Sequence, residues 1–156
     1  MILEIKKYPN PILKKKAGEI REISAEIKSL AKDMIETMAQ GDGIGLAGPQ
    51  VGESKRMIAI VTEQGPEVFI NPKIVVKSGE KELIEEGCLS FPGLFLKISR
   101  AKSVEVEALA LQGEKVRIKA TGLLARIFQH EIDHLDGILI INRISLRQKV
   151  WRLING

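Results

Sequence analysis

Residues 121–137, with the sequence TGLLARIFQHEIDHLDG, contain both histidines of the chain. Leu123, Ile127, His130 and His134 recur at the spacing of one helical face, so we expect a helix that Thr121 caps and Gly137 ends. Its polar side would consist of Arg126, Gln129, Asp133 and Asp136. A helix this apolar must be covered on several sides, which makes it the expected centre of the fold.

The rest of the chain favours an α+β fold, with antiparallel sheets packed around this central helix and a helix at the C-terminus. Strand patterns cover residues 56–62, 67–77, 82–85, 94–98, 103–110 and 114–120. Before them we expect a short turn beginning at Asn10-Pro11, a helix from Ser24 to Gly41, and a glycine-rich loop over 41–52. After the central helix we expect a strand in the apolar run 138–141 and an amphipathic helix over 145–154 that packs on the body. Residues 1–156 would form a single catalytic domain.

Composition excludes several classes of protein. The chain is 44% hydrophobic and 28% charged, with a net charge of +4 whose charges are interspersed. This pattern favours solubility over specific nucleic-acid binding. The apolar runs are too short to cross a membrane, and the N-terminal residues lack the apolar centre of a signal peptide. A single cysteine excludes an intrachain disulfide, so we expect a cytoplasmic protein.

The sequence His130-Glu131-Ile132-Asp133-His134 is an H-E-x-x-H motif, which on a helix places two imidazoles one turn apart beside a carboxylate. Catalytic sites of the zinc type use three protein ligands and leave one position for water. The only cysteine, Cys88, is the natural third ligand, although Glu85, Glu86 or Asp136 would also be chemically suitable. A closed structural site would need more Cys or His, so the sequence favours an open, catalytic site.

The glycine-rich loop contains a literal G-x-G-x-x-G from Gly43 to Gly48. A helix precedes it where a dinucleotide-binding unit has a strand, and no helix fits after it, so nucleotide binding is excluded. Glycines without side chains would instead let the backbone approach a ligand, and Gln50 would offer an uncharged hydrogen-bond donor. A simple turn is the alternative.

Three motifs together resemble the peptide deformylase family. They are GIGLAGPQVG over residues 43–52, EGCLS over 86–90 and QHEIDH over 129–134, and the opening residues 8–13, YPNPIL, are also similar. The resemblance covers nearly the whole chain. Two residues depart from the family pattern: Gly48 stands where alanine is usual, and Phe91 where a smaller aliphatic residue is common.

The resemblance implies hydrolysis of the N-formyl group from the first methionine of newly made polypeptides. Cys88, His130 and His134 would bind one divalent metal ion, Fe(II) in cells, with Zn, Ni or Co as alternatives that suit the same ligands. Glu131 would move the proton, while the Gln50 amide and the Leu89 backbone N–H would stabilise the oxyanion. Gly45 would pair with the substrate backbone. The candidates for the methionine pocket are Ile44, Leu123 and Ile127, although the last two would equally serve as plain core.

Two other classes of function share some of these features. An H-E-x-x-H metallopeptidase would also activate water but would cut internal peptide bonds. A non-catalytic, metal-stabilised or ribosome-associated binding protein would hold the metal without needing Glu131. Ribosome association of the basic C-terminal helix is a separate hypothesis.

Arg100 and Glu86 would either orient the metal ligands or form a surface ion pair.

Overall fold

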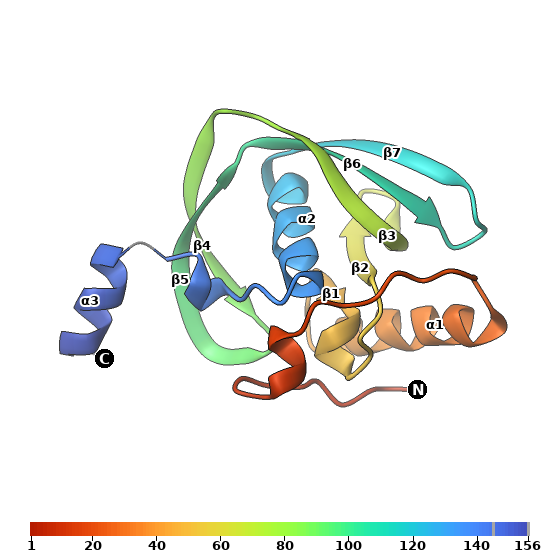
Figure 1. Cartoon of the computed structure of the whole chain (residues 1–156), viewed down its shortest axis with the longest axis horizontal. Helices are drawn as coiled ribbons and strands as arrows, with labels where there is room; N and C mark the ends of the chain where they lie inside the picture. Colours follow the sequence, from red (N-terminus) through yellow and green to blue (C-terminus); the bar gives the residue numbers. More distant parts are fainter. Residues whose placement is uncertain (145, 156) are drawn as a thin grey trace.

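The computed structural model describes residues 1–144 and 146–155, and Figure 1 shows antiparallel strands arranged around one helix, α2 (Gly122–Leu135). One sheet has the strand order β1 (Gly45–Ala47), β2 (Met57–Thr62), β3 (Gly65–Lys77), β6 (Ser103–Ala110) and β7 (Lys115–Thr121). The other consists of β4 (Lys81–Cys88) and β5 (Phe91–Ala101). All strand pairs in both sheets are antiparallel. The predicted α+β class with a C-terminal helix is confirmed.

Helix α1 (Ala25–Gln40) begins and ends where its sequence predicts. The Ser24 hydroxyl accepts a hydrogen bond from the Ile27 backbone N–H at 3.3 Å, which satisfies one of the free donors of the first turn. The buried stripe of the helix consists of Ile27, Ala31, Met34 and Met38, at helical spacing. This stripe packs with residues of β2 and β3 in one apolar cluster. The short turn at Asn10 is the 3-10 helix η1 (Pro11–Lys14).

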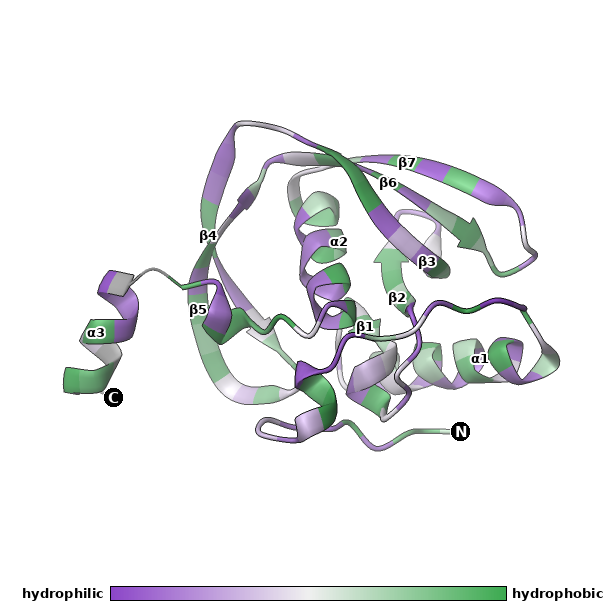
Figure 2. Ribbon diagram, viewed as in Figure 1, coloured by the Kyte–Doolittle hydropathy of each residue, from purple (hydrophilic) through white to green (hydrophobic). Residues whose placement is uncertain are grey.

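The hairpin of β6 and β7 covers α2 with one face only. Val104 and Val106 are buried in the cluster that contains Phe128 of α2, while the residues between them are more exposed. Strand β7 alternates hydrophilic and hydrophobic residues in the same way, as Figure 2 shows. A period of two residues is what a sheet with one buried face requires.

Helix α2 is buried over its whole circumference. Every residue from Ala125 to Leu135 is buried, including Arg126, Gln129 and Asp133 of its polar side. The Gln129 amide, for example, accepts from the Ala101 N–H at 3.0 Å and donates to the Ala101 carbonyl at 2.9 Å. Arg126, Gln129 and Asp133 therefore contact strand β5 rather than water, whereas Asp136, just after the helix, is exposed.

The structure corrects the expectation of a plain loop over residues 41–52. Residues 45–47 form β1, in which Gly45 pairs with Ile60 and Ala47 with Ile58, and Gly48–Val51 form the 3-10 helix η2. A strand of three residues is too short to show an alternating pattern. Its first residue is glycine, a type that favours the prediction of a loop.

The expected strand at residues 138–141 was also wrong, because Ile140–Asn142 form the 3-10 helix η3. The Asn142 side chain accepts from the Leu139 N–H at 2.9 Å and closes this turn. Leu139 and Ile140 are buried against Leu13. The apolar run therefore reflects burial rather than strand pairing.

The C-terminal helix α3 (Leu146–Asn155) forms as predicted, but the expectation that it packs on the body was wrong. Figure 1 shows it projecting away from the sheets, and Trp151 and Leu153 are 62% and 87% exposed. Its amphipathic pattern predicts a helix but cannot say which surface covers the apolar face. Ser145, its expected first residue, lies outside the described residues. Among the helices of the described residues, none has the length and hydropathy to cross a bilayer.

Candidate metal centre

Two separate parts of the fold bring the three predicted metal ligands together. Cys88 is the last residue of β4, while His130 and His134 lie one turn apart on α2. The Cys88 sulfur lies 3.4 Å from His134 Nε2, which lies 3.3 Å from His130 Nε2. Ligands at ordinary metal distances around a tetrahedral ion are about 3.3–3.6 Å apart. Two of the three donor pairs therefore have the spacing of ligands on one ion, and all three donors, which suit a transition metal, lie within 4.8 Å of one another.

The charges around His130 favour a cation. Burial alone would lower the pKa of His130, but the Glu131 charge and the contacts with Cys88 and Glu86 raise it to about 10. Groups that stabilise a proton on this imidazole also stabilise a metal ion that replaces the proton. Burial and the nearby positive charge of His130 lower the pKa of His134, and a neutral imidazole is the form that binds metals.

Glu131 is buried next to the donor cluster. Burial raises its pKa to about 7, and Oε1 has no hydrogen-bond partner among the described residues. A Cβ at Gly45 would lie 2.5 Å from the other oxygen, Oε2. The carboxyl group is therefore held against β1 with one free oxygen, and its pKa lies in the range that suits a general base.

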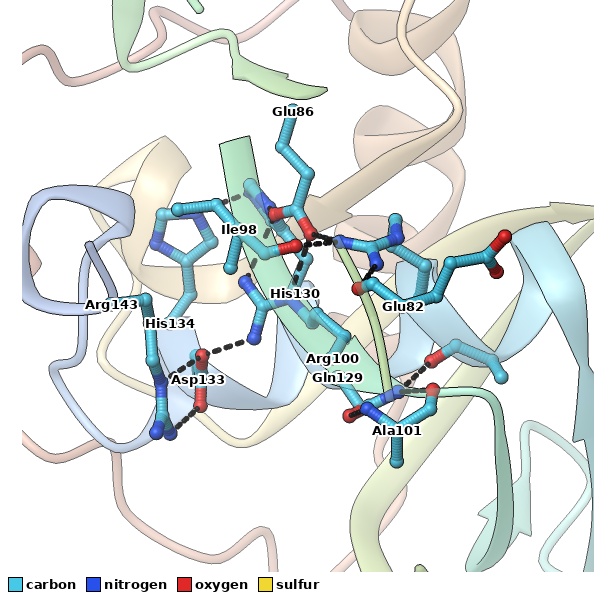
Figure 3. A network of polar contacts seen from close by, with 12 residues as sticks. Glu82, Glu86, Ile98, Arg100, Ala101, Gln129, His130, Asp133, His134 and Arg143 are labelled. Carbon is cyan, nitrogen blue, oxygen red and sulfur yellow. Dashed lines mark hydrogen bonds and ion pairs between the residues drawn. The ribbon is translucent and has the colours of Figure 1, made fainter. Parts of the chain in front are cut away.

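Glu86 fixes the orientation of His130. Its Oε1 lies 2.9 Å from His130 Nδ1, which leaves Nε2 of the ring for the metal (Figure 3). Arg100 donates to both Glu86 oxygens, at 2.7 and 3.0 Å. Arg100 and Glu86 are both buried, so the alternative of a surface ion pair was wrong.

Sequence reasoning missed three further members of this network, namely Arg126, Asp133 and Arg143. Arg126 Nη1 donates to Glu86 Oε2 at 2.5 Å, and Asp133 accepts from Arg100 at 2.7 Å. Arg143 donates to both Asp133 oxygens, at 2.7 and 3.0 Å. For Arg126 and Asp133 the available signal was the presence of charged residues on a helix that is apolar over most of its surface; Arg143 lies after η3, outside that helix.

Gln50 approaches the donor cluster from η2. It is almost fully buried, its Oε1 accepts from the Ala47 N–H at 2.9 Å, and its Nε2 lies 3.5 Å from the Cys88 sulfur. Gly48 is required by the same turn, because a Cβ there would lie 2.5 Å from the Lys55 carbonyl oxygen. The departure at Gly48 from the family pattern therefore has a local steric cause.

A cavity of about 1060 Å³ opens onto the donor cluster. Every predicted site residue except His134 lines it: Ile44, Gly45, Gln50, Cys88, Leu89, Leu123, Ile127, His130 and Glu131. Ile127 is buried, while Ile44 and Leu123 are 48% and 64% exposed. The cavity therefore has an apolar rim and reaches the buried carboxyl group and the ligands.

A Cys-His-His donor set beside a buried carboxyl group, open to a large cavity, defines a metal-dependent hydrolase. Residues 2–150 match the family model described as polypeptide deformylase. The chain therefore belongs to the polypeptide deformylase family, the hydrolases that remove the N-formyl group from newly made polypeptides. Membership of this family disfavours the metallopeptidase alternative.

Comparisons with individual proteins support the same family assignment. A peptide deformylase of Dictyoglomus turgidum is 52% identical over 143 residues, which cover 92% of this chain and 93% of that protein. The crystal structure of the Thermotoga maritima enzyme superposes with a TM-score of 0.90 at 43% identity, covering 93% of this chain and 99% of the other. A Synechococcus elongatus peptide deformylase in complex with actinonin gives a TM-score of 0.91 at 40% identity, covering 98% and 84%.

Proposed function

We propose that residues 1–156 act as one catalytic domain that hydrolyses the formyl group of N-formylmethionyl peptides and nascent chains, with Cys88, His130 and His134 holding the metal. The observation that carries this proposal is the spacing of the three donor atoms, all within 4.8 Å of one another. A bound divalent ion would supply Lewis acidity, lowering the pKa of water and polarising the formyl carbonyl.

Glu131 is proposed to take the proton from the attacking water as the water oxygen bonds to the formyl carbon. It then gives the proton to the departing amine as the carbon–nitrogen bond breaks, so that formate and a free N-terminus are the products. This role is supported by its burial, its free Oε1 and its raised pKa.

The Gln50 amide and the Leu89 backbone N–H are proposed to stabilise the negative oxygen that develops on the formyl group. Support comes from Gln50 Nε2, which already points at the donor cluster, 3.5 Å from the Cys88 sulfur. Losing one such donor typically raises the barrier by about 3–4 kcal/mol.

The substrate's methionine is proposed to enter the cavity against Ile44, Leu123 and Ile127, while Gly45 pairs with the peptide backbone. All four residues line the cavity that opens onto the donor cluster. Ile127 is buried, whereas Leu123 lies mostly exposed at the rim. Ile127 would therefore contact the inner part of the side chain, and Leu123 the outer part.

Fe(II) is proposed as the metal in cells, with Zn, Ni and Co able to occupy the same ligands. Two imidazole nitrogens and one thiolate sulfur suit all four ions. Metal analysis of protein purified without oxygen tests this assignment, because air would oxidise an iron–thiolate site. Zinc as the major metal under those conditions would contradict it.

Because newly made polypeptides are the substrate, we propose a cytoplasmic location and association with the ribosome through α3. The support is its exposed apolar side chains Val150, Trp151, Leu153 and Ile154, next to the basic residues Arg147 and Lys149. Co-sedimentation with ribosomes at low salt tests the association, and absence from the ribosomal pellet would contradict it.

Formate release from formyl-Met-Ala tests the catalytic proposal. The metal-loaded protein should release formate from this peptide and leave unformylated Met-Ala intact. Cleavage of Met-Ala, or of internal bonds in a longer peptide, would instead indicate a peptidase. Formate release that persists after complete removal of the metal would contradict the proposed role of the donor cluster.

A further inference from the structure

The metal centre spans two parts of the fold whose relative position must be fixed by side chains. Cys88 belongs to the two-stranded sheet, and the histidines belong to α2. Among the described residues, β4 and β5 pair only with each other. The distance from the sulfur to the imidazoles therefore depends on how this hairpin docks on the helix.

At its Cys88 end, the hairpin docks on α2 mainly through polar contacts. Phe91, Leu96 and Ile98 of β5 belong to an apolar cluster with residues 13, 139, 140 and 144. In the part of the chain that the structure describes, that cluster contains no residue of α2. Ala101, at the far end of β5, is the residue of this hairpin that joins the apolar cluster of the helix.

Arg126 is the cation on α2 that spans the hairpin. Its Nη1 donates to Glu86 Oε2 at 2.5 Å and to the Ile98 carbonyl at 2.9 Å, and its Nη2 donates to the Glu82 carbonyl at 2.6 Å. Figure 3 shows Glu82, Glu86 and Ile98 grouped on one side of this network. One planar guanidinium thus binds both strands and the carboxylate, a geometry that a lysine ammonium cannot reproduce.

The position of Arg126 connects these bonds to the donor cluster. It lies one helical turn before His130, and Glu86 lies two residues before Cys88. Glu86 also contacts His130 Nδ1, as Cys88 contacts His134 Nε2. The bonds of Arg126 therefore hold the helix to the strand next to the point where the sulfur meets the imidazoles.

We infer that Arg126 is a positioning residue for the metal centre, which fastens the hairpin carrying Cys88 to the helix carrying His130 and His134. The inference rests on the proposed metal site and adds a residue that is neither a proposed metal ligand nor one of the proposed substrate contacts, although it lines the same cavity. Without Arg126 the sulfur would be held less firmly, and the metal would leave faster. Loss of a group that orients metal ligands typically lowers metal affinity 10–100-fold.

The test uses Co(II)-loaded protein, because a cobalt–thiolate bond gives a sulfur-to-metal charge-transfer band. Wild type is compared with Arg126→Met, which keeps an unbranched apolar stem and removes the donors, and with Arg126→Lys. Arg117→Met is the matched control, since Arg117 bridges Glu105 and Glu107 on the exposed face of the other sheet. The band and the rate of cobalt transfer to excess chelator are measured for each.

Arg126→Met should lose cobalt about 10–100-fold faster than wild type, with a changed band. Arg126→Lys should also lose cobalt faster, and Arg117→Met should match wild type. If Arg126→Met retains the wild-type band and rate, even with lowered thermal stability, the residue is only structural and the inference is overturned. If that variant does not fold, Arg126→Lys decides by the same criteria. A wild-type protein without a thiolate band would overturn the proposed metal site itself.

Discussion

Gly45 leaves the space that the carboxyl group of Glu131 occupies. A Cβ on Gly45 would lie 2.5 Å from Glu131 Oε2 and 2.9 Å from its Cγ and Cδ. Gly45 is not among the residues with positive φ, so its backbone conformation does not itself demand glycine. The lack of a side chain at Gly45 therefore leaves room for the buried carboxyl group of Glu131. This role is independent of any contact between the Gly45 backbone and the substrate.

Gly45→Ala should displace Glu131 and lower kcat about 100-fold, the typical effect of a misplacement of about 1 Å. Shortening the carboxylate should offset the added methyl group, so Glu131→Asp should cost less activity in the Gly45→Ala background than in wild type. Kinetic constants for the four proteins of this double-mutant cycle measure the coupling. Gly79→Ala is the control, because a Cβ at Gly79 meets nothing within 4 Å. Additive effects in the cycle would show that the two residues do not interact.

Glu131→Gln should reduce formate release about 100- to 10,000-fold, because the amide keeps the shape of the side chain but cannot accept the proton. Bound metal should remain near wild-type content, since the three donor residues are unchanged. Activity assays paired with metal analysis check both points. A binding protein that only holds metal would be indifferent to this substitution, so unchanged formate release would contradict the catalytic role.

Removal of the metal by a chelator should abolish activity and lower the melting temperature. An ion that binds only the folded protein adds stability that grows with its concentration relative to its Kd. Scanning calorimetry before and after chelation, and again after adding Co(II), should show a loss and a recovery. Cys88→Ser replaces the thiolate with a poorer ligand and should show a smaller shift on adding Co(II). An equal shift for that variant would exclude Cys88 as a ligand.

The sequence predicted the site better than its surroundings. The histidines and the cysteine were identifiable because these residue types are rare in the chain, and Leu123 and Ile127 followed from the helical period. The bonds of Arg126 to Glu82, Glu86 and Ile98 were not predictable, because they join residues 28–44 positions apart in the sequence. The placement of α3 failed for the same reason, since amphipathicity does not specify a partner surface.

Glu86→Gln should destabilise the metal-free protein at neutral pH, and this loss should shrink in acid. Burial alone would raise the pKa of Glu86, but hydrogen bonds from His130 and Arg100 outweigh it and hold the pKa at about 2, below the ordinary 4.5. Because the pKa of Glu86 is lower in the folded protein than in the unfolded chain, its charge stabilises the fold. This stabilisation is fully present above pH 4.5 and is lost as the pH falls through about 2.

Urea unfolding of wild type and Glu86→Gln at pH 7, 4 and 2.5 measures this difference in the free energy of unfolding. Comparing the two proteins at each pH cancels the titration of groups far from Glu86. The titrations of His130 and Glu131 do not cancel, because Glu86 helps to raise the pKa of each. Glu107→Gln is the control, because its ion pair with Arg117 is exposed and such pairs contribute little. A gap between wild type and Glu86→Gln that stays constant from pH 7 to 2.5 would mean that the Glu86 charge does not stabilise the fold, because only an ionised carboxylate loses its advantage in acid.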